Sequence, residues 1–350
     1  MTAHQLNFLH NFNSLSAPMR AAISALYEGK PILLLDAHDR ENEGDLIIAA
    51  EKITAQSMNF LIREGSGVVC LAMPKADLEA LGLPMMIHNN TNTFQTAFTV
   101  SIEAATGVST GVSAKDRAHT IQTAIADDAR PEHLARPGHV FPLAARMGGV
   151  FERMGHTEGS VDLMKIAGLK AGAVLCELMN PDGSMTVGQE RINFAHNNNI
   201  PVLCVEDIFF YRIKTEDIFS RSTTKNIETR FGPLTWRSFQ AFDSTIDLFM
   251  PRDFAPSSAC NLNIIDGNNL HNRFLSQLLT QSNDDALALA LANLSRGVVA
   301  MIDGECDKRS YAILCRSLME TGVSTLARSN SYQDFYTIAE EHFSFQIVRS

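Results

Sequence analysis

The sequence predicts an α/β protein: a domain with a largely buried sheet flanked by helices, followed by a second, smaller α/β domain. Two observations carry this prediction. Over the first 215 residues, short apolar runs alternate with segments of helical spacing, which is typical of alternating strands and helices. After about residue 214 the chain becomes polar and then a new alternation begins. The length of 350 residues also fits about two domains, at roughly 150 residues each.

Five short apolar runs are the expected strands of the first domain. They are rich in Val, Ile and Leu and are bounded by Gly, Pro or Asn. In order along the chain they cover residues 31–35, 68–73, 98–102, 173–178 and 201–205. Runs this apolar favour strands that are covered on both faces.

Three segments between these runs have apolar residues at helical spacing. They cover residues 19–28, 113–125 and 188–197. Ser113 and Asp116 have the spacing of a capping box, which marks a helix N-terminus. In the second domain, residues 284–294 are the clearest helix and 297–302 a strand, whereas the polar residues 215–229 are expected to form a linker or connecting helix.

Composition excludes several classes of function. The net charge is −10 and no basic tract stands out, which argues against nucleic acid or an anionic membrane as the main partner. The longest apolar runs fall far short of the roughly 18 residues of a membrane span. The N-terminus lacks the features of a secretory signal, so a cytoplasmic location is expected. The six cysteines form no C-x-x-C pair and are expected to be buried and reduced.

The segment DAHDRENEGD at residues 36–45 is the strongest candidate for chemistry. Five of its ten residues are acidic, and apolar runs precede and follow it. Carboxylates at the end of a buried strand are well placed to bind a hard cation such as Mg²⁺. The alternative is a solvated acidic turn, which the apolar neighbours on both sides disfavour.

A second candidate is the segment 136–158, which contains His139, His156, three arginines and four glycines. Backbone amides in Gly-rich segments and arginine side chains both suit phosphate. The spacing of His156 and Glu158 matches the H-x-E of zinc deaminases. The P-C-x-x-C segment that this interpretation needs is absent.

Two further features have functional and structural alternatives. Residues 107–111 match G-x-S-x-G, but the expected strand ends near Ile102, too early for a nucleophile elbow. A small-residue loop that enters the helix at Ser113 fits phosphate binding better. Glu177 ends an apolar strand, where desolvation would favour its neutral form and suit it to proton transfer. The alternative is that its side chain reaches solvent.

Together these segments resemble 3,4-dihydroxy-2-butanone 4-phosphate synthase over about residues 15–213. No single short motif carries the resemblance. The matching pieces are DxxDRENEGD at 36–45, REGSGVVCLAM at 63–73, LPMM at 83–86, FTVSIEAATGVSTGVSAKDRAHTI at 98–121, RPGHVFPL at 136–143, GGVFERMGHTEGSVDLMKIAG at 148–168 and AGAVLCELMNPDG at 171–183.

The resemblance implies a mixed sheet flanked by helices, in a homodimer whose active sites lie at the interface. It implies an enzyme of riboflavin biosynthesis that converts D-ribulose 5-phosphate to L-3,4-dihydroxy-2-butanone 4-phosphate and formate. The implied cofactor is Mg²⁺ or Mn²⁺, with two ions per site. The rival enzyme class is a metal-dependent sugar-phosphate isomerase or aldolase, and an isomerase would release no formate. The non-enzyme rival is a regulatory or scaffold protein built on an inactive synthase domain.

The resemblance also assigns roles to residues. Glu41 and His156 match the metal ligands, and His139 and Glu177 match catalytic positions. Either Asp45 or Glu177 could take the first proton. The positions that match substrate contacts are Arg40, Glu41, Asp45, Ser109, Thr110, Arg153, Met154, Gly155, His156, Thr157 and Glu177.

The division expected from these observations is a synthase domain at 1–215 and a second domain at 226–350. The second resembles GTP cyclohydrolase II at residues 230–233 (RFGP) and 295–299 (SRGVV). The zinc-binding cysteine cluster of that enzyme is missing, because Cys260, Cys306 and Cys315 lack its spacing. A diverged, non-catalytic domain is therefore expected.

Overall fold

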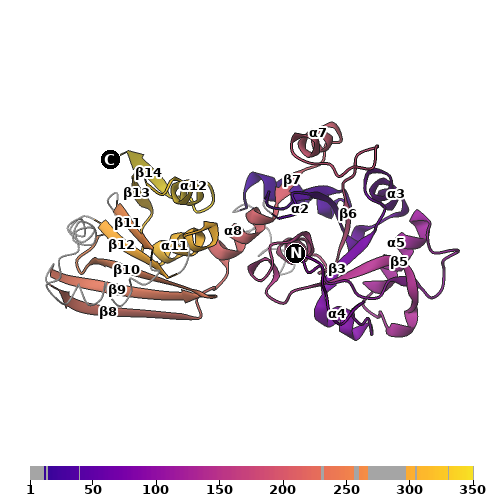
Figure 1. Cartoon of the computed structure of the whole chain (residues 1–350), viewed down its shortest axis with the longest axis horizontal. Coiled ribbons are helices and arrows are strands. Elements are labelled where there is room, and N and C mark those ends of the chain that lie inside the picture. The colour runs from indigo at the N-terminus through magenta and orange to yellow at the C-terminus, as the bar shows by residue number, and fades with distance from the viewer. Residues whose placement is uncertain are drawn as a thin grey trace. The chain divides into compact units, whose positions relative to one another are not determined.

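The structure is a computed structural model that describes residues 12, 15–38, 40–229, 232–255, 260–266, 297–303, 306–329 and 331–349. The chain divides into two compact units, Met1–Phe209 and Phe210–Ser350 (Figure 1). The division falls within helix α8 (Val205–Thr215), a few residues before the expected boundary at residue 215. No helix within these described ranges is long and apolar enough to cross a membrane.

The first unit is built on a seven-stranded mixed sheet in the order β4-β5-β3-β6-β2-β1-β7. Strand β1 is parallel to β7 and β3 is parallel to β5, while the other neighbours are antiparallel. The mixed α/β fold is therefore confirmed. The strands are β1 (Ile32–Leu35), β2 (Gly44–Ala49), β3 (Cys70–Pro74), β4 (Ile102–Ala104), β5 (Leu134–Ala145), β6 (Ala173–Glu177) and β7 (Val202–Cys204).

Helices flank this sheet (Figure 1). They are α2 (Ala17–Tyr27), α3 (Ala55–Glu64), α4 (Lys75–Ala80), α5 (Ala114–Ala124), α6 (His156–Ala167) and α7 (Gln189–Asn197), with short 3₁₀ turns at Ala50–Lys52, Pro131–His133 and Gly149–Phe151. The Ser113 hydroxyl caps α5 by accepting from the amide of Asp116. The Asp116 carboxylate accepts instead from Ser109 and from the amide of Gly111, so only half of the expected capping box forms.

The two faces of the sheet are covered by different helices. Alternate strand residues such as Ile48 and Val174 join one hydrophobic core with Leu61 of α3 and Ile121 of α5. Because successive side chains of a strand point to opposite faces, the intervening residues of β2, β3 and β6 face the other side. Helix α6 packs against these strands and is the element that meets that second face.

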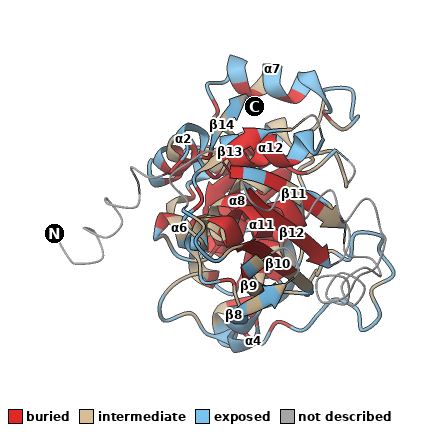
Figure 2. Cartoon of the chain, turned by 90° about the vertical axis from the view of Figure 1, so that its left-hand side faces the viewer, coloured by how far each residue is buried: buried red, intermediate tan, exposed pale blue. Residues whose placement is uncertain are grey.

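The second unit has its own seven-stranded sheet in the order β14-β13-β11-β12-β10-β9-β8. Its strands are β8 (Arg221–Thr229), β9 (Gly232–Ala241), β10 (Ser244–Pro251), β11 (Cys260–Asp266), β12 (Gly297–Asp303), β13 (Thr325–Arg328) and β14 (Gln346–Arg349), and its helices are α11 (Lys308–Glu320) and α12 (Gln333–Glu341). Figure 2 shows the buried residues along β12 and on α11 that form its core. The expected second α/β domain is therefore present.

Some expected elements differ from those observed. The run at 98–102 contributes only its last residue to a named strand, β4. The 12-residue strand β5 was not expected, because its prolines and Gly138 disguise the strand pattern. Residues 221–229 form strand β8, so the expectation of a linker or connecting helix is wrong there. The strand expected at 297–302 is confirmed as β12. The helix expected at 284–294 lies outside the described residues.

Candidate active site and metal centre

A pocket lies on the face of the sheet that α6 covers. Asp45 on β2 and Glu177 on β6 are directly opposite each other in the antiparallel register, so both carboxyl groups enter this pocket. The alternation of the neighbouring strands adds apolar or weakly polar side chains to the same floor. The lining residues are Arg40, Glu41, Glu43, Asp45, Cys70, Thr96, Phe98, Leu143, Arg153, His156, Thr157, Leu175 and Glu177.

The acidic loop is organised by Asp36, at the end of β1. Its buried carboxylate accepts hydrogen bonds from the backbone amides of Glu41 (3.1 Å) and Glu43 (2.9 Å), and it pairs with the Arg40 guanidinium at 2.8 Å. Through these three contacts, the carboxylate of Asp36 holds the acidic loop in a folded-back conformation. Glu41 is thereby directed toward His156.

Arg191 of α7 holds the same loop from another side. Its guanidinium donates to the backbone carbonyl of Glu43 at 2.8 Å and to the Asn42 side chain at 3.1 Å. Asn42 has a φ of 57°, a left-handed conformation that asparagine tolerates better than most residues. Arg191 is one of the two buried residues of α7, so this helix is tied to the acidic loop.

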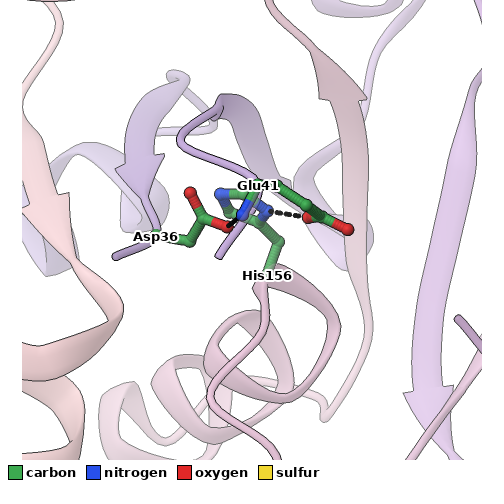
Figure 3. Close-up of side chains that lie close together, drawn as sticks. All are labelled: Asp36, Glu41 and His156. Atoms are coloured by element: carbon green, nitrogen blue, oxygen red, sulfur yellow. Dashed lines mark hydrogen bonds and ion pairs between the residues drawn. The ribbon is translucent and has the colours of Figure 1, made fainter. Parts of the chain in front are cut away.

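A group of possible metal ligands forms where this loop meets the start of α6. One ligand atom each of Asp36, Glu41 and His156 lies within 4.8 Å of the others (Figure 3). His156 Nδ1 is 3.6 Å from Glu41 Oε2 and 3.6 Å from Asp45 Oδ1. Because Asp36 already serves the loop backbone, the donors available to a cation are Glu41, His156 and Asp45.

Two buried polar atoms in this group have no hydrogen-bond partner among the described residues. They are Nε2 of His156 and Oδ1 of Asp45. An orphaned buried polar atom is costly, and a bound cation would satisfy a carboxylate oxygen and an imidazole nitrogen together. The donor set of carboxylates and one imidazole therefore fits a divalent cation such as Mg²⁺ or Mn²⁺.

Burial and charge shift the proton affinities of these groups. Burial raises the pKa of Asp45 to about 7; the carboxylates of Glu177, Glu41 and Glu43 add to this rise and His156 opposes it. Burial alone would lower the pKa of His156, but the charge of Asp45, together with Glu41 and Asp36, outweighs burial and raises it. For Glu41, burial is outweighed by His156 and Arg40, so its pKa is lowered.

The N-terminus of α6 and two arginines form an anion-binding corner of the pocket. Gly155 is the N-cap and supplies no side-chain cap, so the first amides of the helix remain available. A Cβ on Gly155 would lie 2.4 Å from Arg153 Nη1 and 3.0 Å from Arg40 Nη2, so any larger residue would have to displace these guanidinium groups. Arg153 is held by the buried Glu158, at 2.6 Å.

The segment around Phe94 closes one side of this corner. Arg153 donates to the Phe94 carbonyl from Nε at 3.1 Å and from Nη2 at 3.0 Å. The guanidinium carbon of Arg40 lies 5.4 Å from the centre of the Phe94 ring. Thr96 accepts a hydrogen bond from Arg153 at 3.4 Å, and Phe98 pairs with Leu143 in an antiparallel bridge, so both reach the pocket. Sequence reasoning missed Thr96 because the segment HNNTNTFQT at 88–96 has no acidic or cationic cluster to mark it, and it placed Phe98 only in an expected strand.

Three expected site residues lie elsewhere. Ser109, Thr110 and His139 do not line the pocket. The Ser109 hydroxyl donates to Asp116 at 2.7 Å, and His139 pairs with Glu103. Met154 follows the pocket residue Arg153 in the sequence but does not line the pocket.

The other expected residues come together around the pocket: Arg40, Glu41, Asp45, Arg153, His156, Thr157 and Glu177, with Gly155 between the two arginines. Sequence reasoning missed Glu43, Cys70, Leu143 and Leu175. For the last three, the available signal was strand alternation, since each shares a face with Asp45 or Glu177.

Comparison with known proteins adds independent findings. The model of the 3,4-dihydroxy-2-butanone 4-phosphate synthase family matches residues 20–211. A synthase of that name from Chloroherpeton thalassium is 60% identical over 195 residues, which are 56% of this chain and 86% of the relative.

Two solved structures are similar as well. One is a 3,4-dihydroxy-2-butanone 4-phosphate synthase in complex with two magnesium ions, with a TM-score of 0.54, 39% identity, and coverage of 55% of this chain and 95% of that one. The other is RibBX, a two-domain synthase from A. baumannii, with a TM-score of 0.71, 25% identity, and coverage of 95% and 99%.

The burial of Asp45 leads to a prediction about stability and pH. Its carboxyl group ionises near pH 4 in the unfolded chain but at about 7 in the fold. Between these values the unfolded chain loses a proton that the folded chain keeps, so stability falls as pH rises toward 7; the full cost is present above 7 and amounts to at most about 4 kcal/mol. With EDTA present, Asp45→Asn should raise the melting temperature relative to wild type at pH 8.

The melting-temperature difference should shrink toward pH 4.5, where the wild-type carboxyl is neutral in the fold. Thermal melts at both pH values measure it. Asp128→Asn is the control, because Asp128 lies in an exposed turn. A variant of Asp45 that is less stable than wild type at pH 8, or a difference that does not depend on pH, would contradict the expectation.

Proposed function

Because the chain belongs to the 3,4-dihydroxy-2-butanone 4-phosphate synthase family, we propose that the pocket around His156 is its active site. The enzyme converts D-ribulose 5-phosphate to L-3,4-dihydroxy-2-butanone 4-phosphate and formate in riboflavin biosynthesis. The observation that carries the assignment of the site is the pair of buried, unpartnered atoms on Asp45 and His156 beside Glu41. Such a group is costly in a purely structural role and useful in proton and cation chemistry.

The substrate phosphate binds at the anion-binding corner. Arg40 and Arg153 supply charge, and the first amides of α6, at His156 and Thr157, supply hydrogen bonds. Phosphate would take over the donors of Arg153 that now engage the Phe94 carbonyl. This places the sugar carbons toward Asp45 and Glu177, deeper in the pocket.

Glu41 and His156 hold the divalent cation, with the free oxygen of Asp45 beside them. We propose Mg²⁺, with Mn²⁺ as the alternative, and two ions per site, because a related synthase was solved with two magnesium ions. When bound, the cation supplies Lewis-acid stabilisation of negative charge on adjacent substrate oxygens. His156, buried and neutral when it ligates, fixes the position of the substrate oxygens relative to the two carboxyl groups.

Asp45 and Glu177 carry the proton transfers. The reaction begins with removal of the proton next to the ketone, and later steps return protons during loss of water and of formate. A base works best when its pKa is close to the working pH, and burial brings the pKa of Asp45 to about 7. Glu177 lies opposite in register and accepts a hydrogen bond from Ser66 at 2.7 Å. Either carboxyl group can take the first proton.

His139 acts on the substrate in the pocket of a second copy, in a homodimer. Two observations support this proposal: His139 does not line the pocket of its own chain, and its side chain is 47% exposed. Val68 and Val112 are exposed apolar side chains, and Arg117 links their segments by donating to the carbonyls of Val112 and Gly67. Such a surface suits an interface between copies of the chain.

The second unit, from about residue 226 to 350, is a diverged relative of GTP cyclohydrolase II without its chemistry. The residues 230–231 and 295–296, which belong to this resemblance, lie outside the described part of the chain. Burial raises the pKa of Cys260 to about 11 and also raises that of Cys315, so these thiols are poor sources of the thiolates that zinc needs. Cys70, Cys176, Cys260 and Cys315 are reduced thiols, which supports a cytoplasmic location.

The first prediction tests the activity and its cation together. Purified protein with D-ribulose 5-phosphate and Mg²⁺ should release formate, and EDTA should stop the release until Mg²⁺ or Mn²⁺ is restored. Glu41→Gln and His156→Ala should each lower the rate by at least about 10²-fold, because each removes a cation ligand. Circular dichroism should remain unchanged, and Glu79→Gln, on an exposed helix, is the control. Full activity in folded Glu41→Gln protein would remove the acidic loop from the cation site.

The second prediction tests the shared active site. His139→Ala and His156→Ala should each retain only a small residual rate. When the two variants are mixed and allowed to exchange subunits, one site of each mixed dimer regains both histidines. Random exchange should therefore restore about 25% of the wild-type rate per site. No recovery in demonstrably mixed dimers would mean that His139 acts within its own chain, and a monomer by light scattering would reject the dimer.

The third prediction concerns the second unit. The full-length protein should contain no stoichiometric zinc and should release neither formate nor pyrophosphate from GTP, while ribulose 5-phosphate turnover is intact. Metal analysis and a pyrophosphate assay measure this. Stoichiometric zinc together with GTP turnover would show a second catalytic site.

A further inference from the structure

His139 lies on an irregular part of strand β5. The pairing of β4 with β5 matches Ile102 to Val140 but matches the next residue, Glu103, to Ala135. Residues 136–139 of β5 therefore have no pairing partner between Ile102 and Glu103 of β4. A bulge of this kind re-aims side chains at the point where it occurs. It places the His139 ring beside Glu103, the first residue of β4 after the irregularity.

Nδ1 of His139 contacts a carboxylate oxygen of Glu103. The two side chains differ in exposure: that of Glu103 is 19% exposed and that of His139 is 47% exposed. The carboxylate is therefore set into the protein, while about half of the imidazole faces outward. Among the described residues, Nδ1 is the ring nitrogen that has a partner, so Nε2 is the nitrogen left for chemistry.

Two glycines make this arrangement possible. A Cβ on Gly111 would lie 2.0 Å from Oε1 of Glu103, so the carboxylate occupies space that any other residue at 111 would fill. A Cβ on Gly138 would lie 2.1 Å from the carbonyl of Ile102, so glycine is also needed where the bulge meets β4. The loop before α5 is in turn fixed by the contacts of Asp116 with Ser109 and with the Gly111 amide. Gly111, the last residue of the G-V-S-T-G segment, thus forms a cradle for Glu103.

We propose that Glu103 is a positioning residue for His139, held in the cradle that Gly111 provides. The inference rests on the proposed role of His139 in the reaction. A carboxylate that accepts a hydrogen bond from Nδ1–H selects the tautomer in which Nε2 is free to accept a proton, and it stabilises the imidazolium that forms when Nε2 does so. Glu103 acts through His139 and does not itself need to touch substrate.

The kinetic test compares Glu103→Gln and Glu103→Ala with wild type in the full-length protein. Glutamine keeps the size of the side chain and removes its charge, so it also serves if the alanine variant does not fold. We expect kcat to fall on the order of 10²-fold for Glu103→Ala, and less for Glu103→Gln, with KM unchanged. In a Glu103→Ala, His139→Ala double variant, the rate should equal that of His139→Ala alone. Losses that multiply would assign Glu103 a separate, structural role and overturn the proposal.

Gly111→Ala tests the cradle, because its new methyl group must displace the Glu103 carboxylate. It should lower kcat in the same way as Glu103→Ala. The matched control is Gly183→Ala: Gly183 has a φ of 87°, close to the 80° of Gly111, but a Cβ there meets nothing within 4 Å. Equal losses in the two glycine variants would attribute the effect to backbone strain and would count against the cradle.

A spectroscopic readout separates this proposal from the proposed function. Nitrogen-15 spectra of histidine-labelled protein, assigned with His139→Ala, report the tautomer of His139. We expect protonation at Nδ1 in wild type and loss of that fixed tautomer in Glu103→Ala. If His139→Ala retains full activity, its proposed role fails while this spectrum still upholds or rejects the contact. An unchanged tautomer in Glu103→Ala would overturn the proposal whatever the activity.

Discussion

The pairing of Asp45 with Glu177 on adjacent strands is the constraint on which the rest of the site depends. Two acidic side chains directly opposite each other in an antiparallel pair repel, and burial of Asp45 removes the water that would screen them. The surrounding structure offsets this cost at several points. His156 at the start of α6 approaches Asp45, and the Ser66 hydroxyl donates to Glu177 while accepting from the amide of Val68. A cation at Glu41 and His156 would complete the compensation.

The same constraint explains why the site lies on one face of the sheet. Apolar side chains form the core that α3 and α5 cover. On the other face, the N-terminus of α6 brings amides, His156 and a nearby arginine, Arg153, to the carboxyl groups. The fold therefore separates a face that stabilises the unit from a face where uncompensated charge is kept for chemistry. Gly155 allows the arginines to crowd together at that face.

Much of this organisation could be predicted from the sequence. The apolar runs gave four of the strands, and the density of acidic residues at 36–45 marked the loop beside His156. Strand β5 was missed because Pro137, Gly138 and Pro142 are untypical of a strand; the first two lie in its irregular part, which forms only where β5 pairs with β4. The residues Thr96 and Phe98 were missed because they reach the pocket through a hydrogen bond from Arg153 and a bridge to Leu143, both distant in sequence. Periodicity reports local geometry, and contacts of this kind have no local signature.

The hydrogen bonds of Arg191 couple the stability of helix α7 to the order of the acidic loop. Few other residues of α7 are buried. Arg191 and Ala195 are the buried residues of α7, and most of the remaining helix faces solvent (Figure 2). Opening of α7 would release the Glu43 carbonyl and the Asn42 side chain, and with them the order of the loop. By linkage, a ligand that orders the loop must slow amide hydrogen exchange in α7, although the helix packs on the other face of the sheet. The hydrogen-exchange rate of the α7 amides therefore reports whether a cation is bound at the site.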